Sequence, residues 1–108
     1  MLVAGAACPR ALVQTLYAKL PTTDLYNEYG HTEATVWCSA YRIPAEPGPM
    51  AIGKAIPNTQ IYLLDKDLNP VPTGAIGEIY VGGDGVAQGY WNQTEKTALS
   101  VVMVAHCI

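Results

Sequence analysis

Prolines and glycines divide this 108-residue chain into short segments, and this division limits the folds that it can adopt. Pro9 stands where a helix could begin, and Pro21 stands where that helix must end. Between these prolines, three leucines follow one another at intervals of four residues: Leu12, Leu16 and Leu20. The spacing predicts an amphipathic helix over residues 11–20, with the leucines on its apolar face.

Short strands are expected on both sides of a proline-rich loop. Residues 24–27 predict the first strand. The loop is indicated by four closely spaced residues: Pro44, Pro47, Gly48 and Pro49. Beyond it, residues 60–64 and 76–81 predict two further strands, and the glycines within 82–85 predict turns. This order of elements favours the α/β class, with α+β character at this size: a short αβ segment followed by an antiparallel β unit.

Composition excludes several kinds of function. The chain is long enough for one small domain at most. Its net charge of −3 gives no basic surface, so we expect no nucleic-acid partner. Its apolar runs are far shorter than the ~20 residues that a membrane span requires, so we expect no membrane partner. The cysteines are odd in number and widely spaced, which argues against disulfides and favours a cytoplasmic location: Cys8, Cys38 and Cys107.

The segment 27–33 carries the groups that a nucleotide site needs. Tyr29 offers a flat face for a base, and Gly30 lets the backbone turn tightly and approach a ligand. Thr32 can donate to a phosphate, and Glu33 supplies an oxygen ligand of the kind that Mg²⁺ prefers. An ordinary polar turn remains the alternative interpretation of these residues. The glycines further along match neither of the glycine motifs that bind phosphate, because their spacing is wrong and no Gly-Lys-Ser or Gly-Lys-Thr occurs.

Three segments together resemble consecutive motifs of the AMP-forming acyl- and aminoacyl-adenylating enzymes, and most of all the adenylation domains of nonribosomal peptide synthetases. They are residues 27–37, 52–65 and 77–91, in the order and spacing of that family. The resemblance runs from about Leu2 to Ala98. It implies that the chain is part of the large N-terminal domain of an adenylate-forming enzyme.

The resemblance also implies a division of the chain. Residues 1–98 are expected to be a partial AMP-binding domain, and residues 99–108 an apolar tail that does not look like the continuation of the family. Several parts of the family are not found here: the upstream Ser/Thr/Gly-rich phosphate loop, the aspartate that holds the ribose, the hinge and the C-terminal lysine. We therefore expect an internal piece of an adenylation domain that is inactive alone.

In this family a carboxylic acid, here expected to be an amino acid, attacks the α-phosphate of ATP with Mg²⁺ bound. Aminoacyl-AMP and pyrophosphate form, and the acyl group then passes to a thiol, the phosphopantetheine of a carrier protein domain. Two alternatives stay open for this chain. One is a piece of an acyl- or aryl-CoA or carrier ligase of the same superfamily, and the other is a noncatalytic remnant or interaction module.

Residue roles follow from the same resemblance. The residues expected to bind ATP are Asn27, Glu28, Tyr29, Gly30 and Thr32, with Tyr29 stacked on adenine. The catalytic residues are Thr32, at the phosphates, and Glu33, which holds the metal. The substrate pocket is expected to include Leu2, Ala4, Glu28, Val36 and Trp37. Glu28 is the one polar member of this pocket, and we expect it to favour a polar or cationic substrate side chain. We expect Trp37 and Trp91 to pack in the core rather than to stack on a ligand.

Two positions depart from the family pattern. His31 stands where the family most often has proline, and Gln88 stands where arginine is frequent. A histidine there could add a donor near the phosphates, but variation within a loop is the simpler explanation.

Overall fold

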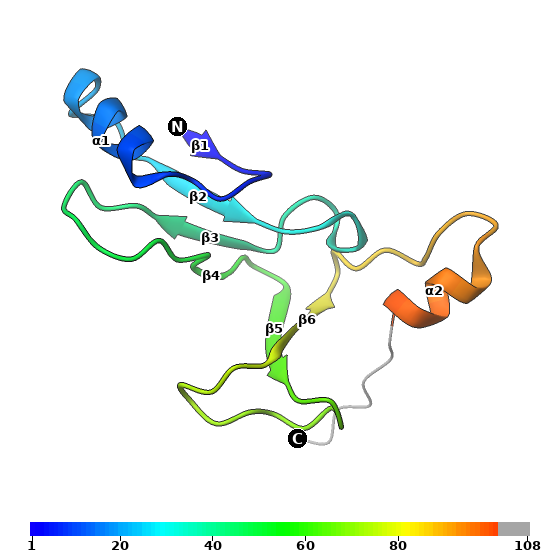
Figure 1. Cartoon of the computed structure of the whole chain (residues 1–108). Helices are drawn as coiled ribbons and strands as arrows, with labels where there is room; N and C mark the ends of the chain where they lie inside the picture. Colours follow the sequence, from blue (N-terminus) through cyan, green and yellow to red (C-terminus); the bar gives the residue numbers. More distant parts are fainter. Residues whose placement is uncertain (102–108) are drawn as a thin grey trace.

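The fold is built around a sheet of four short strands, seen in a computed structural model that describes residues 1–101 (Figure 1). In spatial order the strands are β1 (Leu2–Val3), β2 (Tyr26–Tyr29), β3 (Ser39–Arg42) and β4 (Lys54–Ala55). β1 and β2 are parallel, whereas β3 pairs antiparallel with both β2 and β4. The parallel pair is joined through the helix α1 (Arg10–Lys19), since parallel neighbours need a crossover connection.

The helix α1 and the sheet enclose the main apolar core. Three residues there are almost completely buried: Val13, Leu25 and Ile43. Leu16 and Tyr17 of α1 pack against them, so the buried face follows the helical spacing of three and four from Val13. The helix was predicted correctly, but its predicted face was wrong in part, because Leu12 and Leu20 are exposed.

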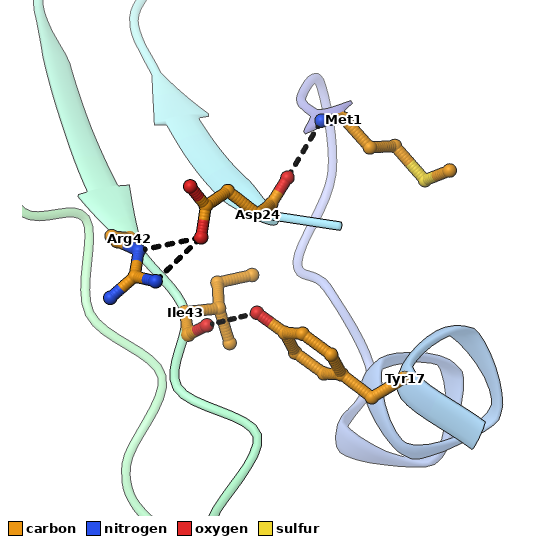
Figure 2. A network of polar contacts seen from close by, with 5 residues as sticks. All are labelled: Met1, Tyr17, Asp24, Arg42 and Ile43. Carbon is orange, nitrogen blue, oxygen red and sulfur yellow. Dashed lines mark hydrogen bonds and ion pairs between the residues drawn. The ribbon is translucent and has the colours of Figure 1, made fainter. Parts of the chain in front are cut away.

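Polar contacts fasten this helix and the strands to one another (Figure 2). The Tyr17 hydroxyl reaches from α1 and donates to the Ile43 carbonyl at 2.7 Å. On the sheet, the Arg42 guanidinium contacts the Asp24 carboxylate through two of its nitrogens. The Met1 nitrogen donates to the Asp24 carbonyl at 2.7 Å. These contacts hold the strands together at the end of the sheet where β2 begins.

Two sequence predictions for this sheet need correction. The strand expected at 24–27 is displaced, because Tyr26–Tyr29 is the stretch that pairs with β3. No strand was predicted at 39–42 or at 54–55, yet β3 and β4 form there, one on each side of the predicted proline-rich loop. Ser39–Arg42 has no strong alternation of apolar and polar residues, and its pairing with β2 is what makes it a strand.

The predicted antiparallel unit is confirmed. β5 (Thr59–Leu64) pairs with β6 (Glu78–Gly83) in a two-stranded sheet, which extends away from the first sheet in Figure 1. The chain then continues to a short helix, α2 (Thr94–Ser100). The predicted boundary at Ala98 lies within this helix, and most of the predicted tail, 102–108, lies outside the described residues.

The two sheets do not form one closed core. The radius of gyration is 16.4 Å, above the roughly 13 Å of a compact domain of about 100 residues. Trp91 is 89% exposed, so the prediction that it packs in the core was wrong for the part of the chain that the structure describes. Neither helix within residues 1–101 is long and apolar enough to cross a membrane.

Candidate active site

A cavity of about 380 Å³ lies at the carboxyl ends of β1 and β2. Its lining comes from three separate stretches of the chain: Gly5, Ala6, Ala7, Asn27, Glu28, Tyr29, Gly30 and Ile52. Open α/β sheets hold their ligands at this end of their parallel strands. The cavity therefore lies where the topology favours a ligand site.

Four of the cavity residues were predicted from the sequence, namely those of the segment 27–30, and four were not. The residues Gly5, Ala6 and Ala7 form the connection that leaves β1, where Gly5 has a φ of +80°. In the sequence this stretch looks like the end of a buried strand. The positive φ that glycine tolerates is the signal that could have indicated a turn there. Ile52 approaches the cavity through the loop after β3, which local sequence patterns do not reveal.

Gly30 is required by the close approach of two backbone segments. A Cβ at this position would lie 2.3 Å from the Trp37 Cα and 2.5 Å from the Val36 carbonyl oxygen. The chain leaves β2 at Gly30 and returns as β3 after a single turn, so no side chain fits between the two. The predicted need for glycine at this turn thus has a steric basis.

Two side-chain contacts hold the Ile52 stretch beside the strands. The Asn27 amide nitrogen donates to the Ala51 carbonyl at 2.8 Å. The Ser39 hydroxyl donates to the Ile52 carbonyl at 2.8 Å. The side-chain carbonyl oxygen is the acceptor of the Asn27 amide and is the atom that can accept from a ligand.

Thr32 and Glu33 lie in the short 3₁₀ helix η1 (Thr32–Ala34), which follows the turn directly but does not line the cavity. The Glu33 carboxylate lies 3.0 Å from His31 Nδ1. The pKa of Glu33 lies below its usual range, first because its backbone N–H donates to the carboxylate and second because of the His31 contact. Glu33 is therefore ionised at neutral pH.

The donor set around Glu33 is compatible with Mg²⁺. No group of three or more His, Cys, Asp or Glu side chains that could hold a metal is present within residues 1–101. Mg²⁺ does not need one, because it is usually held by one or two carboxylates together with substrate phosphates and water. One ionised carboxylate on an accessible turn fits that pattern.

The other four pocket residues predicted from the sequence do not line the cavity: Leu2, Ala4, Val36 and Trp37. Leu2 is paired with Tyr26, and side chains alternate along a strand, so Leu2 and Glu28 lie on the same face. Ala4 comes directly after β1 and is exposed. Val36 is 76% exposed and has a φ of +79°, which is unusual for a β-branched residue. Trp37 is partly exposed at 39%, so it is not a core residue of the described chain.

The cavity, the ionised carboxylate beside it and the topology agree with a comparison of the chain with known families. A model of the AMP-binding enzyme family matches residues 1–91. The chain belongs to the AMP-binding enzyme family. Its relatives include nonribosomal peptide synthetases, so the resemblance seen in the sequence is confirmed.

Three curated relatives illustrate the similarity. A component of the linear gramicidin synthase of Brevibacillus parabrevis is 45% identical over 102 residues, which are 94% of this chain and 2% of that protein. Indigoidine synthase of Dickeya dadantii is 44% identical over 99 residues, 87% of this chain and 7% of that protein. A dimodular nonribosomal peptide synthase of Bacillus subtilis is 43% identical over 103 residues, 91% of this chain and 4% of that protein. The chain thus spans a small part of each of these relatives.

Solved structures agree with this fold. A holo four-domain nonribosomal peptide synthetase bound to AMP and glycine matches with a TM-score of 0.79 and 42% identity, over 89% of this chain and 7% of that one. A nonribosomal peptide synthetase protein containing adenylation and PCP domains matches with a TM-score of 0.88 and 31% identity, over 97% of this chain and 22% of that one. The predicted fold class, a mixed α/β piece of an adenylation domain, is confirmed.

Proposed function

We propose that this chain is the part of an amino-acid-activating adenylation domain that receives ATP, in an enzyme that forms aminoacyl-AMP and pyrophosphate. The observation that carries the proposal is the cavity at the carboxyl end of β2, with the Glu33 carboxylate on the turn that follows. The match of residues 1–91 to the AMP-binding family supports the same assignment.

The base of the nucleotide enters the cavity in this proposal. Tyr29 stacks on adenine, since an aromatic face and a base gain from stacking once both are removed from water. Asn27, Glu28 and Gly30 form the wall beside the base. The side-chain carbonyl oxygen of Asn27 accepts from an exocyclic amine, while its amide nitrogen donates to the Ala51 carbonyl.

The phosphates lie along η1 rather than in the cavity. Thr32 donates its hydroxyl to a phosphate oxygen, and Glu33, already ionised, holds Mg²⁺. Bound Mg²⁺ supplies positive charge that neutralises the phosphates as charge develops at the α-phosphate. Both side chains act by being in place beforehand, since a donor and a metal ligand fixed near the reacting phosphate need no rearrangement during the reaction.

The amino acid occupies a pocket to which five positions of this chain contribute: Leu2, Ala4, Glu28, Val36 and Trp37. Leu2 and Glu28 share a face of the sheet, which supports their contact with one ligand. The carboxylate of Glu28 favours a substrate with a polar or cationic side chain. The acyl group then passes to the phosphopantetheine of a carrier domain, a partner supported by the solved relative that contains adenylation and PCP domains.

The 108-residue chain does not form an adenylate alone in this proposal. The family's phosphate loop, its ribose-binding aspartate and the C-terminal lysine that contacts the reacting carboxylate are not among residues 1–98, which we assign to the partial AMP-binding domain. Catalysis by positioning requires all these groups together. Residues 99–108 are assigned to a separate tail.

Calorimetric titration of the chain with ATP·Mg²⁺ tests the nucleotide site. Tyr29→Phe keeps the aromatic face and should bind as the parent does, whereas Tyr29→Leu should lose most of the affinity. Glu33→Ala should abolish the dependence of binding on Mg²⁺, and Glu95→Ala, an exposed carboxylate on α2, serves as its matched control. Absence of binding by a chain that circular dichroism shows to be folded would refute the nucleotide role.

A pyrophosphate-exchange panel, run on an adenylation domain that contains this segment, tests the substrate class. Amino acids are expected to support exchange better than fatty or aryl acids. The aryl acid alternative is supported by an N-terminal subdomain from Klebsiella oxytoca in complex with 3-hydroxybenzoyl-AMSN. It matches with a TM-score of 0.79 and 26% identity, over 91% of this chain and 24% of that one. Unchanged preference between cationic and aliphatic amino acids after Glu28→Ala would contradict the role of Glu28.

A further inference from the structure

Ser39 is the only fully buried polar residue within residues 1–101, and it has no contact with the cavity. It lies at the start of β3, where it is paired with Tyr29 on one side and with Ala55 of β4 on the other. Its position is therefore central to the sheet, directly beside the strand end that carries Tyr29.

A buried hydroxyl is unfavourable unless it finds a hydrogen-bond partner, and an alanine would fill nearly the same volume without that cost. The partner that Ser39 finds is the carbonyl of Ile52, 2.8 Å away. Ile52 is one of the residues that line the cavity. Through one hydrogen bond, Ser39 thus connects the strand paired with Tyr29 to the cavity wall contributed by Ile52.

The stretch that follows Ile52 is pressed against the same strand. Gly53 has a φ of +85°, and a Cβ there would lie 1.9 Å from the Ala40 carbonyl oxygen. The backbone therefore runs in direct contact with β3. The Ser39 hydroxyl is the side-chain contact made to Ile52 itself, beside the contact of Asn27 with the neighbouring Ala51 carbonyl.

We infer that Ser39 is a positioning residue of the base-binding cavity: its hydroxyl holds the Ile52 wall at a fixed place relative to Tyr29. The inference rests on the proposed function for the identity of the ligand, an adenine nucleotide. It assigns no contact between Ser39 and the ligand. The effect of Ser39 on binding is exerted through the position of Ile52 alone.

The test compares two hydroxyls that each donate to a loop carbonyl. Ser39→Ala removes the bond to Ile52, and Tyr17→Phe removes the 2.7 Å bond to Ile43, which is buried away from the cavity (Figure 2). Loss of a hydroxyl that has only a structural role would lower stability and leave nucleotide affinity unchanged, and we expect this result for Tyr17→Phe. Ser39→Cys keeps a donor, which is weaker and slightly larger than the hydroxyl. Its effect should be intermediate, and it carries the test if Ser39→Ala does not fold.

Calorimetry with three probes measures the effect. A misplacement of about 1 Å in a site can lower a reaction rate by up to ~100-fold. For binding affinity we expect a smaller effect, with Ser39→Ala weakening AMP and ATP·Mg²⁺ binding by roughly tenfold. Binding of Mg²⁺·tripolyphosphate, which has no base, should be unchanged, and Tyr17→Phe should leave all three affinities within about twofold. Equal losses for Ser39→Ala and Tyr17→Phe at equal loss of stability, or an equal loss for tripolyphosphate, would overturn the inference.

A second measurement separates this inference from the proposed function. In the chain without ligand, the methyl NMR signal of Ile52 should shift in Ser39→Ala and remain in place in Tyr17→Phe. If the parent chain binds no nucleotide, the proposed function fails, while a selective shift at Ile52 still supports the positioning role. An unmoved Ile52 signal in Ser39→Ala would overturn the positioning role whether or not nucleotide binds.

Discussion

Replacement of Gly30 by alanine should be among the most damaging single changes near the cavity, although it adds only a methyl group. The new Cβ would lie 2.3 Å from the Trp37 Cα, whereas ordinary van der Waals contact begins at 3.4 Å. One of the two backbone segments must therefore move by about 1.1 Å, the difference between these distances. The obstructing atoms belong to the backbone, so no change of rotamer can relieve the contact.

The cost follows from what such overpacking does elsewhere. Extra methyl groups in packed sites typically cost ~1–3 kcal/mol, and a backbone obstruction places Gly30→Ala at about 3 kcal/mol. With an m-value of about 2 kcal/mol per molar urea, the unfolding midpoint should fall by about 1.5 M. Total stability of a domain of this size is roughly 5–15 kcal/mol, so a large part of it would be lost.

Urea unfolding followed by tryptophan fluorescence measures this change, with Gly85→Ala as the control. A Cβ at Gly85 would meet only the Ala34 carbonyl oxygen at 3.6 Å, an ordinary contact, so its midpoint should stay near that of the parent chain. A loss below about 0.5 kcal/mol for Gly30→Ala, or equal losses for both variants, would refute the steric argument.

Three other outcomes are expected. Leu25→Ala should lower the free energy of unfolding by ~2–5 kcal/mol, since Leu25 is 2% exposed, whereas Leu99→Ala, at an 82% exposed residue, should change it by less than about 0.5 kcal/mol in the same urea assay. The folded pKa of Glu33 lies below its ordinary value of 4.5, so its contribution to stability is present above that pH and is lost as the pH falls through the folded value. The difference in urea midpoint between the parent chain and Glu33→Gln should therefore be present at neutral pH and disappear in acid; a difference that grows in acid would contradict this sign. Burial raises the pKa of the Cys38 thiol, so peptide mass spectrometry after iodoacetamide treatment should find Cys8 alkylated well before Cys38, and the reverse order would contradict the burial of Cys38.

Local patterns predicted the elements whose formation depends on neighbours in the sequence. The helix between Pro9 and Pro21 begins and ends close to those prolines, and the two strands of the β5–β6 unit form where β-rich runs are bounded by turns. Features that local patterns did not predict are set by contacts between residues that are distant in the sequence. The buried face of α1 is set by Leu25 and Ile43, so Val13 faces inward while Leu12 does not.

The residues of the candidate site also fall into those that the sequence could predict and those that depend on contacts between distant residues. Tyr29 and Gly30 were found from their residue types, and Asn27 and Glu28 from the family resemblance. The four are adjacent in sequence and line one cavity. Ile52 and the Ser39 hydroxyl could not be predicted, because they meet only after β3 and β4 have paired. Pairing of the chain with itself over such separations leaves no periodic signal in the sequence.

Two hydrogen bonds tie η1 to the base of the β5–β6 hairpin. Thr35 donates to the Gly85 carbonyl at 2.6 Å, and the Ala87 amide donates to the Glu33 carbonyl at 2.8 Å. The tolerance of the hairpin for inserted residues therefore differs between its two ends. Residues added at its far end, between 64 and 78, leave these bonds intact, while one residue added between Gly83 and Ala87 changes the span that anchors Glu33. Natural variation in length should accumulate at the far end and be rare at the near one.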